Sequence, residues 1–203
     1  MKKQLGPTDV IFPVPAALVV SGHGKAANIL TIAWIGILSS TPPTIGISLH
    51  QRRYSLELIR QHQEFTVNFP AAGQFREVDY CGISSGRKHH KAKELGFTLL
   101  PGAVINTPLI QECPYNIECK VTQAIELGEY TLFMAEIVET HVDEAHFDPT
   151  NRANINIASL DPLVYCAVIR EYWRLGEKLG KGFDAGRAIL DAVQENDTPA
   201  ATT

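Results

Sequence analysis

The chain has 203 residues, of which 45% are hydrophobic and 20% charged. This composition is typical of one folded domain and excludes a largely disordered chain. A formal net charge of −4 disfavours a dedicated nucleic-acid binder, and no apolar run approaches the ~18 residues of a membrane-spanning helix.

Strand patterns dominate the first third of the chain. Residues 16–21 form a short apolar run, and residues 28–37 are rich in Ile, Thr and Trp. In residues 44–49 and 64–69, apolar and polar side chains alternate with the period of two that indicates a half-buried strand.

Three short helices are expected next. Residues 55–63 have Leu56 and Ile59 on one side, with Ser55 as the expected N-cap and Glu57 in the first turn. Residues 72–81 and 89–95 form two further candidate helices on either side of a loop rich in glycine and serine. Gly96 is a natural stop for the second of these helices.

The clearest pattern in the second half is an antiparallel hairpin. Residues 115–125 place Tyr115 and Ile117 on one face and Asn116 and Glu118 on the other. Residues 127–129 (Leu-Gly-Glu) form the expected turn, and residues 130–138 run back. Residues 163–169 are a further strand candidate, and residues 171–179 a last helix before Gly180.

Many short strands with a few short helices predict a mainly β protein, a barrel with helical covers. The strands do not alternate with long helices, which argues against a doubly wound parallel sheet. We expect a single domain over residues 1–203, with its core at about 10–180 and a frayed tail at 195–203.

The four cysteines are expected to be reduced thiols. They stand at positions 81, 113, 119 and 166, without a Cys-x-x-Cys pair or zinc-ligand spacing, so we expect no metal site. The first nine residues have two lysines but no apolar signal core. Together these features predict a cytoplasmic protein.

Several catalytic motifs are missing from the sequence. Residues 22–25 (Gly-His-Gly-Lys) lack the full P-loop spacing, and Ala26 stands where a magnesium-binding Ser or Thr would be. There is no Gly-x-Gly-x-x-Gly after a strand and no Gly-x-Ser-x-Gly elbow. The sequence therefore does not indicate chemistry by a side-chain nucleophile.

Three segments could form a binding site. Residues 28–34 place Asn, Thr and Trp among apolar residues, as a ligand wall or simply as a buried strand. Residues 50–55 join a strand to a helix, and Arg53 and Ser55 there form either an anion site or a solvated loop with a Ser cap. Residues 81–91 combine glycines, serines and Lys91, and fit either a phosphate loop or a basic surface turn.

In this order the segments resemble the flavin reductase-like family with the FMN-binding split barrel, particularly its flavoredoxin-like branch. The resemblance covers residues of about 10–180. The motifs that carry it are Asn28-x-x-Thr31-x-Ala33-Trp34, Pro42-Pro43 before the strand at 45–49, Arg53-x-Ser55, the strand at 64–68, Ser85-Gly86, Lys91 and residues 172–177.

The resemblance implies a fold and a function. The fold is a Greek-key antiparallel β-barrel with a few short covering helices, assembled as a homodimer with the flavin near the subunit interface. The implied activity is hydride acceptance from NAD(P)H at flavin N5, with electrons passed to free flavin, a metal ion or a protein partner. FMN is the expected cofactor and FAD the alternative.

Two other functions stay open at this point. The first is a flavin-binding or electron-carrier protein without turnover. The second is an oligonucleotide-binding barrel, which the net charge disfavours.

The resemblance also implies a set of flavin-binding residues. Residues 28–34 would line the ring and ribityl chain, residues 48–49 would flank the ring, and the remaining members of the set would donate to the phosphate. For His50, a surface or packing role is favoured over contact with flavin or nicotinamide. The implied residues are Asn28, Thr31, Ile32, Ala33, Trp34, Ser48, Leu49, Arg53, Ser55, Ser84, Ser85, Gly86 and Lys91.

Overall fold

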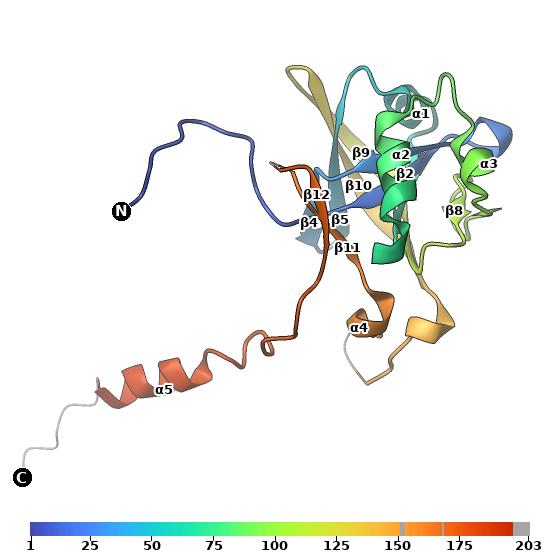
Figure 1. The fold of residues 1–203 in the computed structure, drawn as a ribbon. Helices are drawn as coiled ribbons and strands as arrows, with labels where there is room; N and C mark the ends of the chain where they lie inside the picture. The colour runs from blue at the N-terminus through green and yellow to red at the C-terminus, as the bar shows by residue number, and fades with distance from the viewer. Residues whose placement is uncertain (151–152, 168, 197–203) are drawn as a thin grey trace, which may run out of the picture.

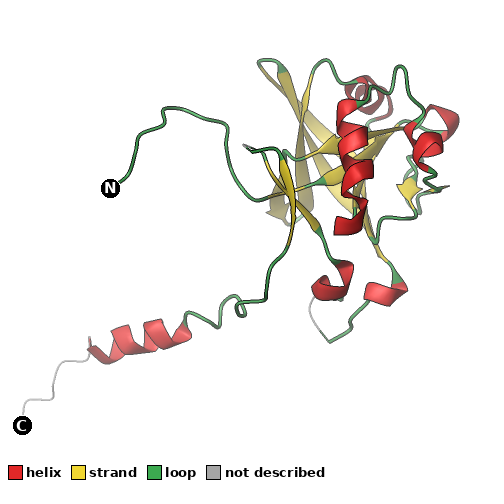
Figure 2. Ribbon diagram, viewed as in Figure 1, coloured by secondary structure: helices red, strands yellow, loops and turns green. Residues whose placement is uncertain are grey.

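The computed structural model describes residues 1–150, 153–167 and 169–196, so most of the predicted tail at 195–203 lies outside the described residues. Its main sheet has seven antiparallel strands in the spatial order β3-β2-β6-β9-β10-β5-β4. Figures 1 and 2 show this sheet with α2 (Phe75–Ile83) and α3 (Lys91–Leu95) lying against it. The strands are β2 (Ala17–Ser21), β3 (Asn28–Ile32), β4 (Ile35–Ser40), β5 (Pro43–His50), β6 (Glu64–Phe69), β9 (Tyr115–Leu127) and β10 (Tyr130–Val142).

The sheet curls into a barrel because its two outer strands follow one another along the chain. Only Ala33 and Trp34 separate β3 from β4. The backbone N–H of Ser48 on β5 donates to the carbonyl of Trp34 at 3.0 Å, which extends the β4–β5 pairing into the short link that follows β3. The chain leads from β5 through α1 (Tyr54–His62) to β6, yet β5 lies beside β10. This connection makes the barrel a Greek key, and the predicted fold class is confirmed.

β2 is buried on both faces. Ala17 and Val19 point into the barrel core. Leu18 and Val20 belong to a second core on the outside of the sheet, together with Val78 of α2. This double burial explains why residues 16–21 read as an apolar run without alternation.

The remaining elements surround the barrel. The α1 side chains Leu56 and Ile59 enter the barrel core. No helix among the described residues is long and apolar enough to cross a membrane. The other elements are β1 (Val14–Pro15), β7 (Leu99–Leu100), β8 (Leu109–Ile110), α4 (Ile157–Leu160), β11 (Leu163–Cys166), β12 (Glu171–Arg174), α5 (Arg187–Asn196) and three 3-10 turns at Gly24–Ala26, Ala72–Gln74 and Glu144–His146.

Two predictions in the first half of the chain need correction. The single strand expected at 28–37 is interrupted at Ala33 and Trp34, because the chain there passes from one edge of the sheet to the other. Ser55 is not the N-cap of α1; Arg53 holds that position in an extended conformation. The Ser55 hydroxyl instead accepts a hydrogen bond from Asn28, which pulls it toward β3.

The C-terminal prediction was also wrong. Residues 171–174 form the strand β12, because Tyr172 and Trp173 pair with β11. Residues 175–179 are not helical, and the last helix is α5, further along the chain. β11 itself ends at Cys166, earlier than the expected 169. The predicted stop at Gly96 is confirmed, since this residue ends α3 with a φ of 69°.

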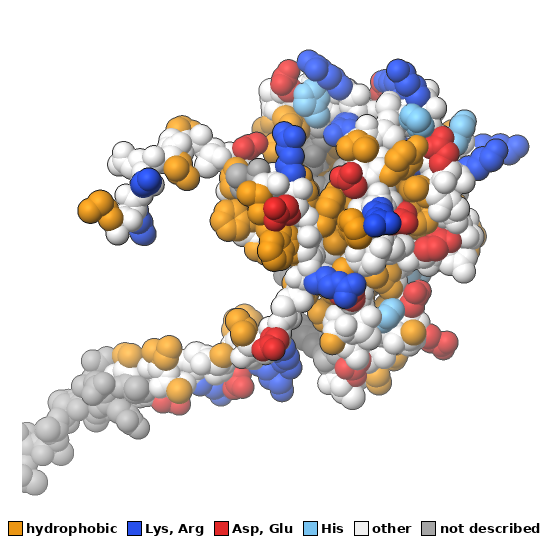
Figure 3. Space-filling view, viewed as in Figure 1, with side chains coloured by type: hydrophobic (Ala, Val, Ile, Leu, Met, Phe, Trp, Pro, Cys, Tyr) orange, Lys and Arg blue, Asp and Glu red, His pale blue; other side chains and the backbone are white. Residues whose placement is uncertain are grey.

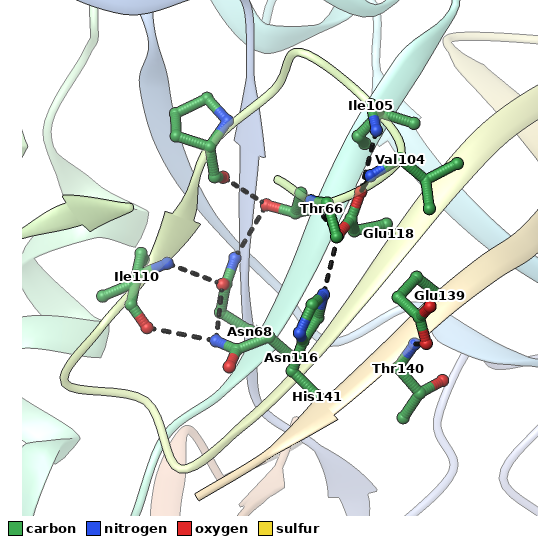
Figure 4. Close-up of polar contacts among 12 residues, drawn as sticks. Thr66, Asn68, Val104, Ile105, Ile110, Asn116, Glu118, Glu139, Thr140 and His141 are labelled. Carbon is green, nitrogen blue, oxygen red and sulfur yellow. Dashed lines mark hydrogen bonds and ion pairs between the residues drawn. The ribbon is translucent and has the colours of Figure 1, made fainter. Parts of the chain in front are cut away.

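The outer face of the β6–β9 pair carries buried polar side chains (Figure 4). Glu118 is fully buried and accepts the backbone N–H groups of Ala103, Val104 and Ile105 at 2.7–2.9 Å, and a hydrogen bond from His141 at 2.7 Å. Burial opposes the charge of this carboxylate, but the hydrogen bonds outweigh burial and lower the pKa of Glu118. This face is therefore an anchor for a covering segment.

Glu64 binds the next two residues of the covering segment, Asn106 and Thr107, in the same way. Its carboxylate accepts the N–H groups of Asn106 and Thr107 at 2.9 and 2.8 Å, and it contacts His23 at 2.7 Å. Two carboxylates thus hold the consecutive N–H groups of residues 103–107. These hydrogen bonds satisfy the backbone N–H groups of the covering segment, which has no strand partner over these residues.

We expect Glu118→Gln to lower the free energy of unfolding by about 3 kcal/mol. Both carboxylate oxygens accept hydrogen bonds, so the amide group of Gln would direct N–H groups at N–H donors. Chemical denaturation measures the change. The matched control is Glu139→Gln, an exposed change on β10 that should stay within about 0.5 kcal/mol. An equal loss in the free energy of unfolding in both variants would contradict the role of Glu118 in holding the covering segment.

Candidate functional site

A cleft of about 510 Å³ lies where the ends of β3 and β5, the first turn of α1 and the segment after α2 meet. This volume is within the range of small-molecule sites. The nineteen residues that line it are Asn28, Leu30, Thr31, Ile32, Ala33, Trp34, Ser48, Leu49, His50, Arg52, Arg53, Tyr54, Ser55, Ile83, Ser84, Ser85, Gly86, Lys91 and Tyr130.

One corner of the cleft is built from Asn28, Ser55 and Gly86. The Asn28 amide donates to the Ser55 hydroxyl at 2.7 Å, and both side chains are buried. The proton of the Ser55 hydroxyl has no acceptor among the described residues, so it is available to a ligand. A Cβ at Gly86 would lie 2.0 Å from the Asn28 Oδ1, so only glycine fits beside this pair.

Arg53 joins the two walls of this corner. As the N-cap of α1 it lies at the start of the helix, and its guanidinium donates to the carbonyl of Gly82 in α2 at 2.8 Å. Arg52 also lines the cleft, and its guanidinium has no partner among the described residues. With Lys91, the lining has three cationic side chains and no Asp or Glu. The cleft therefore favours an anion.

Lys91 is the first residue of α3, and only 3% of it is exposed. Its ammonium donates to the carbonyls of Ile29 on β3 and Cys81 on α2, at 2.8 and 2.7 Å. Burial lowers the pKa of Lys91 to about 8. Two of its three protons are used inside the protein, and the third remains for a ligand in the cleft.

The other end of the cleft has an aromatic wall. The ring centroids of Trp34 and Tyr130 are 4.7 Å apart, and those of Tyr130 and His50 are 5.1 Å apart. His50 Nδ1 accepts the backbone N–H of Arg52 at 3.1 Å, which leaves the ring proton on Nε2. This end offers a flat, largely apolar surface.

All thirteen residues that the resemblance implied lie in this one cleft. Six further lining residues were not in the set: Leu30, His50, Arg52, Tyr54, Ile83 and Tyr130. Three of them, His50, Arg52 and Tyr54, belong to the segment at 50–55, which the sequence marks as a possible binding segment. Tyr130 had no sequence signal, because only the pairing of β10 with β5 places it opposite His50. His50 contacts Tyr130, so its packing role and its place in the cleft are compatible.

A family model described as a flavin reductase-like domain matches residues 10–173. The chain belongs to the flavin reductase-like family. A flavoredoxin structure from Desulfovibrio vulgaris (Miyazaki F) is 36% identical, with a TM-score of 0.84, covering 92% of this chain and all of that one. A flavoredoxin from Methanosarcina acetivorans is 27% identical, with a TM-score of 0.85, covering 93% of this chain and all of that one.

A relative found by sequence comparison is also similar. An uncharacterized protein of Pyrococcus abyssi is 34% identical over 137 residues, which are 67% of this chain and 78% of that protein. Membership of the flavin reductase-like family and the fold of the two flavoredoxin structures agree with the barrel described above.

We expect Lys91 to make the free energy of unfolding of this flavin reductase-like domain depend on pH. The unfolded chain keeps the lysine proton to a pH of about 10.4, whereas the folded chain loses it near pH 8. Between these values the unfolded state binds more protons, so this residue makes the free energy of unfolding rise with pH, by at most about 1.4 kcal/mol per unit.

The measurement is chemical denaturation of the wild type and Lys91→Met at pH 8 and pH 10. The buried Cys81 thiol, whose pKa burial raises to about 12, contributes with the opposite sign in both proteins and cancels in the difference. The free energy of unfolding of the wild type minus that of the variant should grow from pH 8 to pH 10. If it does not, Lys91 keeps its proton in the folded state.

Proposed function

We propose that this chain is an FMN-binding oxidoreductase of the flavin reductase type. It would take a reduced nicotinamide, NADH or NADPH, as electron donor, and free flavin, a metal ion or a partner protein as acceptor. When bound, the flavin would supply the redox chemistry, hydride acceptance at N5 and onward transfer of electrons. The two similar structures named flavoredoxins support this reading.

The observation that carries the proposal is the pairing of two chemistries in one cleft. Hydroxyl and cationic donors converge at one end without an acidic lining residue, and aromatic rings line the other end. A flavin mononucleotide has the same polarity, a phosphate at one end and a flat ring system at the other. Phosphates are held by convergent hydroxyl, N–H and cationic donors.

The residues that line the cleft fit the phosphate of a flavin mononucleotide. Ser55, with an unused hydroxyl proton, would donate to the phosphate together with Ser84, Ser85 and Arg53. Gly86 keeps this corner open, because any Cβ there would strike Asn28. Lys91 would supply positive charge from beneath the corner while holding β3 against α2.

The ring end would be bound largely by backbone. Thr31 donates its hydroxyl to the carbonyl of Val78, so its side chain positions β3 against α2. Backbone groups of residues 31–34 would then face the flavin ring, with Ser48 and Leu49 beside it. A cofactor that carries the electrons needs binding and orientation from the protein, and no side-chain nucleophile.

We also infer a cytoplasmic homodimer with the flavin near the subunit interface. Trp34 at the cleft is 38% exposed, and Ile37 on the adjoining β4 is 65% exposed, so apolar surface continues from the cleft onto the sheet edge. All four cysteines are free thiols, in keeping with a reducing compartment.

The first test is the visible spectrum of the purified protein, followed by anaerobic addition of NADH and then NADPH. We expect flavin bands that bleach with at least one donor. A flavin that stays oxidised with both donors would favour the alternative, a flavin carrier without turnover. Absence of flavin after incubation with FMN and with FAD would contradict the proposal, and competition between the two would identify the preferred flavin.

The second test changes the phosphate corner. Gly86→Ala should weaken FMN binding about tenfold or more, because its Cβ would displace Asn28 and with it the Ser55 hydroxyl. Gly82→Ala is the matched control, since its Cβ would meet Thr31 at an ordinary contact of 3.4 Å. Fluorescence titration with FMN measures both affinities. An unchanged affinity in Gly86→Ala would place the phosphate elsewhere.

A further inference from the structure

The chain leaves the body of the protein after β12 and continues as an extended C-terminal arm, residues 175–196, that ends in α5 (Figure 1). Residues 175–186 have no helix or strand. Backbone hydrogen bonds within the arm shape it, such as those from Ala185 to Lys181 and from Leu190 to Gly186. The arm thus points away from the barrel that it follows in sequence.

The C-terminal arm carries large apolar side chains that a single copy leaves in water. Leu179 and Phe183 are fully exposed, and Ile189 on α5 is 71% exposed. Ile189 and Val193 are four residues apart and share one face of the helix. A ten-residue helix is marginal on its own in water, so α5 needs an apolar surface to pack against.

Such a surface lies on the body where the arm begins. A groove of about 240 Å³ runs between β12 and the start of α2. Phe75 and Trp173 border it and are 42% and 55% exposed. Figure 3 shows hydrophobic side chains gathered on this side of the body, between the two chain ends. Arg174 is the charged lining residue, and Asp161 pairs with it at 3.3 Å, so the groove suits an apolar occupant.

We propose that in the dimer the C-terminal arm of each copy lies in the groove of the other copy. β12 forms one wall of the groove and leads directly into the arm. A twofold axis beside β12 would therefore exchange the two arms through two identical contacts, as closed dimers require. The twelve residues between β12 and α5 can span up to about 40 Å, enough to cross to a neighbour.

This exchange rests on the proposed homodimer but not on flavin binding. The C-terminal arm and the groove would join the two copies, and neither is part of the flavin cleft. Because the groove and the flavin cleft have no lining residue in common, the two proposals can fail separately.

The test uses the full chain and two double variants of α5. Ile189→Asp with Val193→Asp places charge on the apolar face, while Arg187→Gln with Asp191→Asn changes exposed charged residues of the same helix. Sedimentation velocity at micromolar concentration should give twice the chain mass of 22.3 kDa for the wild type and the control. The apolar-face variant should raise the dimer dissociation constant at least about tenfold.

A second readout follows the groove itself. The chain has two tryptophans, so Trp34→Phe leaves Trp173 as the single reporter. Acrylamide should quench Trp173 at least about twofold more strongly when the apolar face of α5 carries the two aspartates. Circular dichroism checks that all variants are folded, and FMN titration of the α5 variants that keep Trp34 reports the flavin site independently.

Two outcomes would overturn the exchange. A variant dimer as tight as the wild type, with unchanged quenching of Trp173, would show that the arm does not occupy the groove. A monomeric wild type whose Trp173 becomes more exposed in the variant would show that the arm folds back onto its own groove.

Discussion

Closure of the barrel at Trp34 is the constraint on which the cleft depends. The hydrogen bond from Ser48 to the Trp34 carbonyl brings the end of β3 against the end of β5. The residues after β5, which begin α1, then face the residues of β3 across a short gap. Without this closure, Asn28 and Ser55 would not meet, because β3 and β5 are not neighbours in the order of the sheet.

The second wall of the cleft depends on α2. Thr31 and Lys91 both hold β3 to this helix, through the carbonyls of Val78 and Cys81. The helix in turn covers the outer side of β2, where Leu18 and Val20 are buried. The second hydrophobic core is thus what keeps the loop after α2 in place beside the cleft. Packing outside the barrel positions the donors that a phosphate would need.

The opposite flank shows how buried charge can serve structure alone. Glu118 and Glu64 would be costly to bury without partners, but each accepts several backbone N–H groups and contacts a histidine. They hold residues 103–107 over the outer face of β6 and β9. These two glutamates are not among the residues that line the cleft, so carboxylate–histidine pairs here are no sign of a catalytic site.

The sequence by itself determined the main strands and the hairpin, because alternation and turn residues are local signals. The resemblance to a known family implied thirteen of the nineteen residues that line the cleft. The sequence pattern mispredicted residues 171–179, since pairing with β11 overrides any helical tendency of Tyr172 and Trp173. It could not show that Glu118, on a polar face, is buried, because the covering segment comes from another part of the chain. Tyr130 joined the cleft for the same reason: strand order, which brings distant residues together, is decided only when the whole sheet closes.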